Sequence, residues 1–138
     1  MNIGATGRAG EDAALAMYLK NGFTLVARNY QTKYGEIDLI VKNEKSLVFA
    51  EVKTRTKASR FKGVVAVNHS KKQKLFKTAF LFLKENKYAL APRFDVIDIE
   101  GSWWVVDGRE EFTVDTLHWY KNALTMNDYD GYKQYYGS

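Results

Sequence analysis

The 138-residue sequence contains no cysteine, which excludes disulfide bonds and thiolate metal sites and is compatible with a reducing compartment. It also has no apolar run that approaches the length of a membrane span, and residues 1–8 lack the apolar core of a signal peptide. We therefore expect a cytoplasmic protein that makes no contact with a membrane.

Acidic residues are absent from residues 53–77, although the whole chain carries 16 of them. The same stretch holds these basic residues: Lys53, Arg55, Lys57, Arg60, Lys62, Lys71, Lys72, Lys74 and Lys77. Such a run is most often a solvated surface, but it is also the charge pattern that follows a nucleic-acid backbone. Which of these two interpretations applies depends on the functional residues next to this basic stretch.

The remaining composition predicts one globular domain. Of the residues, 46% are apolar and 14% are aromatic, and a chain of this length can bury one sizeable core. We expect this domain to span residues 1–125. We expect residues 126–138, which are rich in tyrosine, to form a loosely packed terminus. The alternative is that the tyrosine rings stack on unpaired bases.

Two short runs with alternating apolar residues, 36–41 and 47–53, are separated by a small polar loop and predict a β-hairpin. A register centred on this loop gives one wholly apolar face. That register makes the following pairs: Val41 with Val48, Leu39 with Ala50, and Ile37 with Val52.

On the other face of the hairpin, the same register places Asp38 across from Glu51 and Glu36 across from Lys53. Two carboxylates ~5 Å apart repel by about 3 kcal/mol at an effective dielectric constant of roughly 20. Because Lys53 supplies one positive charge against three acids, a divalent cation such as Mg²⁺ would relieve the repulsion. The alternative is a plain ion pair between Glu36 and Lys53, with the other two carboxylates in solvent.

A further metal ligand could come from the first predicted helix. Glu11 shares a helix face with Ala14, Leu15 and Tyr18, so it could point toward the sheet. Asp12 shares a face with apolar residues in the same way, and either acid could instead match the helix dipole. The spacing does not choose between Glu11 and Asp12.

The other elements follow from propensity, periodicity and turn residues. Ser70 and Gln73 have the spacing of a capping box at the start of a second helix. The buried stripe of that helix is expected to contain Leu75, Ala79, Phe82 and Leu83. In chain order we expect a helix at 7–21, a strand at 23–30, a turn at 33–35, the hairpin, a loop at 54–68, a helix at 71–85, strands at 94–100 and 103–106 with a turn at 101–102, and a short helix at 114–124.

A long ordered series of motifs carries a resemblance to a known family. The motifs are Gly10-Glu11 with Ala14 and Tyr18-Leu19, Arg28-Asn29, Gly35-Glu36-Ile37-Asp38-Leu39-Ile40, Leu47 to Arg55, Lys71 to Gln73, Ala79, and Phe94-Asp95-Val96. Together they resemble the YraN family of small bacterial proteins, over nearly everything from Gly7 to Leu124. That family is placed in the restriction-endonuclease-like superfamily, whose signature is an Asp followed by Glu-x-Lys.

The resemblance implies an α/β fold with an αβββαβ core, in which a mixed sheet is flanked by helices. It also implies site roles, because Asp38 corresponds to the metal-binding aspartate of the superfamily. Glu51 and Lys53 correspond to the Glu-x-Lys pair, and Glu11 corresponds to the acid that the first helix lends to the site. It is the resemblance, and not the spacing, that selects Glu11 over Asp12.

The sequence departs from the resembled pattern at a few positions. Ile37 stands where the superfamily has a Pro before the metal-binding Asp, and Gln31 stands where a basic residue often occurs. Either Lys71 or Lys72 could be the counterpart of the usual lysine of the second helix. None of these departures removes an expected ligand.

By this resemblance we expect a metal-dependent endonuclease that hydrolyses DNA phosphodiester bonds. Glu11, Asp38 and Glu51 would bind Mg²⁺ or Mn²⁺, and Lys53 would complete the catalytic set. Flanking phosphates would be bound, without reading of bases, by Arg55, Lys57, Arg60, Lys71, Lys72 and Lys74. By analogy with junction resolvases of the superfamily, the substrate would be branched or partly single-stranded DNA.

Two alternative functions stay open at this point. One is a catalytically idle nucleic-acid-binding protein that acts with a DNA-processing partner, and the other is an interaction domain whose acidic cluster is only structural. Cutting both strands of a duplex would require two active sites, which a homodimer would supply.

Overall fold

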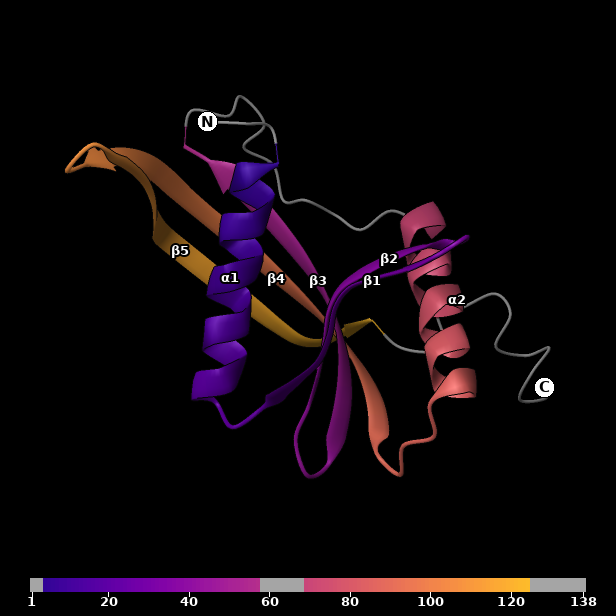
Figure 1. Cartoon of the computed structure of the whole chain (residues 1–138). Coiled ribbons are helices and arrows are strands. Elements are labelled where there is room, and N and C mark those ends of the chain that lie inside the picture. Colours follow the sequence, from indigo (N-terminus) through magenta and orange to yellow (C-terminus); the bar gives the residue numbers. More distant parts are fainter. Residues whose placement is uncertain (1–3, 58–68, 125–138) are drawn as a thin grey trace.

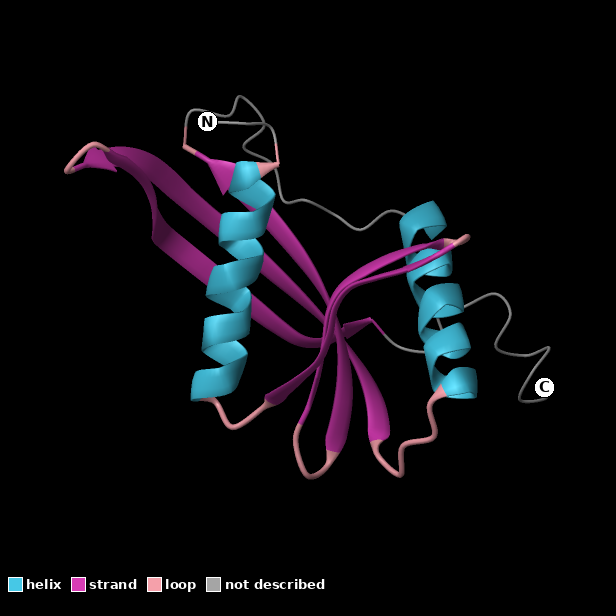
Figure 2. Ribbon diagram, in the orientation of Figure 1, coloured by secondary structure: helices cyan, strands magenta, loops and turns pink. Residues whose placement is uncertain are grey.

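One mixed sheet, covered by a helix on each face, forms the part of the chain that the computed structural model describes, residues 4–57 and 69–124 (Figures 1 and 2). The elements are α1 (Ala5–Lys20), β1 (Thr24–Thr32), β2 (Gly35–Lys42), β3 (Ser46–Thr56), α2 (His69–Glu85), β4 (Ala91–Val106) and β5 (Arg109–Leu124). The strand order is β1-β2-β3-β4-β5, in which β3 and β4 are parallel and the other neighbours are antiparallel. The predicted α/β fold with an αβββαβ core is confirmed, with β5 added at the sheet edge.

The first helix ends where its sequence predicts. The backbone N–H of Asn21 donates to carbonyl oxygens of the last turn, and Gly22 follows with a φ of 86°. This left-handed conformation costs glycine little, which is why Gly commonly follows a helix end. The chain then turns back into β1.

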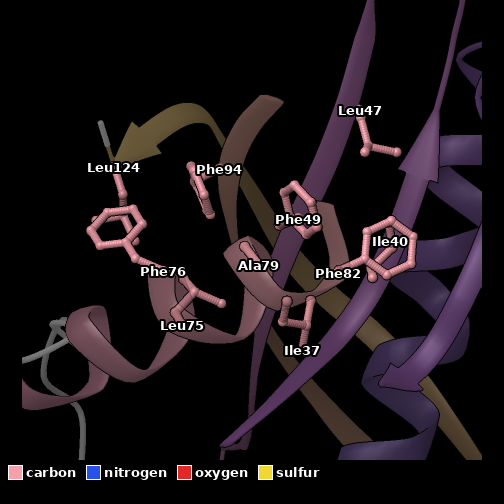
Figure 3. Packing of buried hydrophobic residues seen from close by; sticks show 10 residues of the cluster. All are labelled: Ile37, Ile40, Leu47, Phe49, Leu75, Phe76, Ala79, Phe82, Phe94 and Leu124. Carbon is pink, nitrogen blue, oxygen red and sulfur yellow. The ribbon is translucent and has the colours of Figure 1, made fainter. Parts of the chain in front are cut away.

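Side chains of β3 alternate between two apolar clusters, one under each helix. Leu47 and Phe49 pack with α2, as Figure 3 shows, whereas Val48 and Ala50 pack with α1. The expected apolar face of the hairpin is therefore the face under α1. Ile37 is the exception, since it belongs to the cluster under α2.

The predicted register of the β2–β3 hairpin is confirmed where the strands are paired. The pairing runs from Lys42 opposite Leu47 to Leu39 opposite Ala50. At the next position, the Asp38 carboxylate accepts a hydrogen bond from the backbone N–H of Val52 at 2.8 Å. Figure 1 shows β1 and β2 bending away from β3 toward α2 beyond this point. The sheet thus opens beside Asp38.

The C-terminal third of the sheet differs from its prediction. The turn expected at 101–102 is wrong, because β4 continues to Val106 and the hairpin turn lies at Asp107 and Gly108. Both turn residues have positive φ values, 50° and 76°, as a two-residue hairpin turn requires. The helix expected at 114–124 is also wrong. Those residues form β5, in keeping with their β-branched and aromatic side chains.

The segment around α2 also differs in detail. The loop expected at 54–68 starts too early, because β3 continues through Thr56 opposite Gly101 of the parallel strand β4. Ser70 lies inside α2, which begins at His69, and is therefore not an N-cap. The buried stripe of α2 is Leu75, Phe76, Thr78, Ala79 and Phe82, with Leu83 half-buried. The predicted tail at 126–138 lies outside the described residues.

Candidate functional site

Three carboxylates from two elements lie together where β2 leaves β3. One oxygen each of Glu11 in α1 and of Glu36 and Asp38 in β2 lie within 4.8 Å of one another. We call these three residues the acidic group. Carboxylate oxygens at such spacing are the ligands that Mg²⁺ and Mn²⁺ prefer. The donor set therefore fits a hard divalent cation.

Glu11 belongs to this group because α1 lies very close to β3. A Cβ atom on Gly10 would overlap the hydroxyl of Thr54, so only glycine allows this approach. The side chain of Glu11 is 14% exposed, whereas that of Asp12 is 69% exposed and pairs with Arg28 at 2.7 Å. The structure thus places Glu11 beside Asp38 and leaves Asp12 in contact with solvent.

The carboxyl group of Asp38 is half-buried and surrounded by negative charge. Burial, followed by the charge of Glu51, raises the pKa of Asp38 from 3.8 to about 7. The hydrogen bond from Val52 N–H acts in the opposite direction, and the charges of Glu11 and Glu36 add to the increase. Ionised Asp38 is therefore unfavourable here unless a cation compensates it.

Glu51 of β3 lies between two lysines. Its Oε1 is 2.9 Å from Lys53 Nζ and 3.8 Å from Lys71 Nζ of α2. Burial lowers the pKa of Lys53, but contacts with Lys71 and Glu51 raise it more, so the net shift is upward. The pKa of Lys71 is lowered, first by its contact with Lys53 and then by burial. The Glu-x-Lys pair is thus extended by a lysine from a distant element.

Glu36 contacts Asn29 and Gln31 of β1, and not Lys53 as the alternative ion pair would require. Glu36 Oε2 accepts a hydrogen bond from Gln31 Nε2 at 3.1 Å. With the Asn29 amide oriented so that its nitrogen faces the carboxylates, that nitrogen donates to Glu36 Oε1 at 2.9 Å and to Glu11 Oε1 at 3.2 Å. Glu36 therefore belongs to the acidic group.

A pocket of about 330 Å³ joins the acids to the lysines. Its lining residues are Gly35, Glu36, Asp38, Glu51, Lys71, Lys74 and Leu75. The pocket brings Asp38 and Glu51 to the same side of the sheet, as the hairpin register predicts. It also brings two lysines of the predicted phosphate-binding set to the acids.

The other basic residues of that set lie in different surroundings. Arg55 Nη2 is 3.1 Å from Asp98 Oδ2, with the arginine side chain 19% exposed. Lys57 Nζ is exposed and lies 3.8 Å from Asp115 Oδ2, and Lys72 is half-buried. Arg60 falls outside the described residues. Within the described ranges, Lys71 and Lys74 are thus the predicted phosphate ligands that line the pocket.

Sequence reasoning missed Asn29 and Gln31 as residues of this site. Both lie on β1, whose pairs Arg28 with Leu39 and Tyr30 with Ile37 place Asn29 across from Asp38. A register of β1 against β2 would have located them. However, β1 has an irregularity between Leu25 and Ala27, and its weak alternation did not fix that register.

In the described ranges, none of the helices is both long and apolar enough to cross a membrane.

Comparisons with known proteins place the chain in a family. The model of the uncharacterised protein family UPF0102 matches residues 10–99, which include Glu11, Asp38, Glu51 and Lys53. A UPF0102 protein of Neisseria meningitidis serogroup B is 48% identical over 98 residues, covering 70% of this chain and 84% of the relative. A UPF0102 protein of Desulfosudis oleivorans is 41% identical over 96 residues, covering 69% and 78%. One from Herminiimonas arsenicoxydans is 35% identical over 118 residues, covering 86% and 85%. The chain therefore belongs to the UPF0102 family, in agreement with its YraN-like motifs.

Proposed function

We propose that this protein is a metal-dependent endonuclease that hydrolyses phosphodiester bonds of DNA. The observation that carries the proposal is the pocket in which Asp38 and Glu51 face Lys71 and Lys74. Hydrolysis of a phosphodiester uses carboxylates that bind a divalent cation and amines that bind phosphate oxygens, and this pocket offers both. Membership in the restriction-endonuclease-like superfamily is part of the proposal.

Glu11 and Asp38 would hold Mg²⁺ or Mn²⁺, with Glu36 as an additional oxygen donor from the acidic group. Glu51 lies outside that group but lines the same pocket as Asp38, and it would be the remaining ligand. When bound, such an ion supplies a water of lowered pKa and neutralises charge on the transition state. Asp38 must lose its proton to act as a ligand. Its pKa of about 7 means that a proton and the cation compete for it near neutral pH.

The lysines would bind the substrate. Lys53 Nζ lies 2.9 Å from Glu51 Oε1, so its ammonium group would be placed to bind a phosphate oxygen beside that carboxylate. Lys71 and Lys74 would contact the oxygens of neighbouring phosphates from α2. Because these groups bind the backbone and not base edges, we propose selection by DNA structure, such as branched or partly single-stranded DNA.

The test is a cleavage assay on supercoiled, linear, single-stranded and branched DNA in Mg²⁺, Mn²⁺ or EDTA. Wild-type protein should cut at least one substrate with a metal present and none in EDTA. Asp38→Asn and Glu51→Gln should each lose cleavage. Glu44→Gln is the matched control, because Glu44 is an exposed acid in the turn at the paired end of the same hairpin.

The outcomes separate this proposal from its alternatives. Cleavage that survives in EDTA or in both variants would contradict it. DNA binding without cleavage would instead support a catalytically idle protein that acts with a DNA-processing partner. Failure to bind any nucleic acid at low salt would leave a structural role for the acids.

A further inference from the structure

Asn29 has a backbone conformation that is unusual within a strand. Its φ is 52°, in the left-handed region, although it lies between the paired residues Arg28 and Tyr30 of β1. Asparagine tolerates this region better than most residues, but it is less common there than glycine. Non-glycine residues held in sparsely populated conformations cluster at functional sites. Asn29 lies across from Asp38, so its unusual backbone conformation occurs at the candidate site.

The side chain of Asn29 bridges two elements that carry the acidic group. In the orientation that turns its amide nitrogen toward the carboxylates, that nitrogen donates to Glu36 of β2 at 2.9 Å and to Glu11 of α1 at 3.2 Å. An amide has two N–H donors, so one neutral group can bind both carboxylates at once. One side chain thus ties a carboxylate of α1 to a carboxylate of β2.

Two further residues of β1, Arg28 and Gln31, contact the same two acids. Gln31 Nε2 donates to the other oxygen of Glu36 at 3.1 Å, and Arg28 Nε lies 3.4 Å from Glu11 Oε1. The three β1 residues thus approach two carboxylates that would otherwise repel each other. Asp38 is bound separately, by the backbone N–H of Val52.

From this geometry we propose that Asn29 is a positioning residue, whose amide holds the carboxylates of Glu11 and Glu36 at the spacing that a divalent cation requires. The inference rests on the proposed function, since these carboxylates are proposed metal ligands. It goes beyond that function because it assigns a role to a residue that is not itself a proposed metal or DNA ligand. Groups that orient metal ligands typically change metal affinity about 10–100-fold when they are removed.

The test compares Asn29→Gly with Asn122→Gly. Asn122 of β5 also has a φ of 52°, so both substitutions replace the same side chain in the same backbone conformation. Mn²⁺ affinity is measured by calorimetry, and the unfolding temperature is measured in EDTA. Asn29→Gly should bind Mn²⁺ about 10–100-fold more weakly than wild type and should still fold, because glycine adopts this φ without strain. Asn122→Gly should bind Mn²⁺ as wild type does.

Two results of this comparison would overturn the inference. One is wild-type Mn²⁺ affinity in Asn29→Gly. The other is an equal loss of affinity in both variants, which would show a general effect of a left-handed asparagine. If Asn29→Gly fails to fold, Asn29→Asp keeps the size of the side chain but replaces the donor with a carboxylate. This variant should unfold at a lower temperature than wild type in EDTA and recover with Mn²⁺, and equal unfolding temperatures in EDTA would contradict the proposal.

A metal-independent measurement separates failure of this inference from failure of the proposed function. The side-chain amide signals of Asn29 in a nitrogen-15 correlation spectrum are those missing from Asn29→Gly. They should shift when Glu36→Gln or Glu11→Gln is introduced. If wild type binds no Mn²⁺ and yet the signals shift, the metal proposal fails while the positioning contact stands. Unshifted signals would overturn the contact itself.

Discussion

Gly10 of α1 lies so close to Thr54 of β3 that a Cβ atom on Gly10 would overlap the threonine hydroxyl. Thr54 also pairs with Ile99 of β4. For this reason β3 cannot move away from α1 without disturbing its parallel pairing with β4 at the centre of the sheet. This contact sets the distance between α1 and the sheet. Because Glu11 is the next residue, the same contact sets the position of one carboxylate of the acidic group.

We predict that Gly10→Ala lowers the free energy of unfolding by about 1–3 kcal/mol, the usual cost of overpacking. Gly7→Ala is the matched control in the same helix, because no atom lies within 4 Å of a Cβ atom at that position. It should raise stability by up to about 1 kcal/mol through helix propensity. Urea unfolding of both variants checks the prediction. Equal effects of the two substitutions would show that α1 has room to move at Gly10.

The part of the site that the sequence predicts is the part built from neighbouring strands. The alternation of apolar residues in β2 and β3 determines their register, and that register brings Asp38 and Glu51 to the same side of the sheet. No such local rule places Glu11. Its position depends on how deeply α1 packs on β3, which is a tertiary contact, and only the family resemblance pointed to it. Asn29 and the contact between Lys71 and Glu51 depend on tertiary structure in the same way.

The errors in the fold prediction have a similar cause. Gly101 suggests a turn in the sequence, but it lies within β4, where a Cβ atom would overlap the ring of Phe112 from β5. The local sequence does not distinguish a glycine that is required by close packing of two strands from a glycine that forms a turn. The helix predicted at 114–124 is wrong for a related reason, since these residues form a strand through their pairing with β4.

Replacing the perturbed acid should stabilise the metal-free protein. The pKa of Asp38 is raised to about 7 in the folded state, so the folded protein binds more protons than the unfolded chain between pH 3.8 and about 7. Stability contributed by this group therefore falls as pH rises through that window and stays low above it. Asp38→Asn removes the charge and keeps an oxygen that can accept from Val52 N–H, which is 2.8 Å from the wild-type carboxylate.

We accordingly expect Asp38→Asn to gain about 1–3 kcal/mol of unfolding free energy at pH 8 in EDTA, since one pKa unit corresponds to about 1.4 kcal/mol. At pH 4 the gain should nearly vanish, because the carboxyl group is then mostly protonated in the folded state. Denaturant titrations at the two pH values measure this difference. The exposed Glu44→Gln should change stability little at either pH. A loss of stability at pH 8 in Asp38→Asn would contradict the account of the site.

The same pKa predicts how metal binding depends on pH. A cation that needs ionised Asp38 must displace a proton below pH 7, so the apparent Mn²⁺ affinity should rise about tenfold per pH unit there. Above pH 7 the affinity should level off, because the proton is already lost. Calorimetry from pH 5 to pH 8 tests this profile, with Asp38→Asn as the variant that should bind weakly at every pH. Wild-type affinity that is constant over this range would exclude Asp38 as a ligand.

The pocket lysines should contribute to DNA binding through charge alone. Lys71 lines the pocket and lies 3.8 Å from Glu51, whereas Lys84 is an exposed lysine in the last turn of the same helix. Lys71→Gln should weaken binding to every DNA sequence by a similar factor, and it should reduce the salt dependence of log K by about 1. Lys84→Gln should change neither quantity, because it lies at the opposite end of α2 from Lys71. Fluorescence anisotropy with labelled branched DNA at several salt concentrations gives the affinity and the salt dependence of log K for each variant. If Lys84→Gln lowered the slope as much as Lys71→Gln, DNA would be held by the general charge of α2 and not by the pocket.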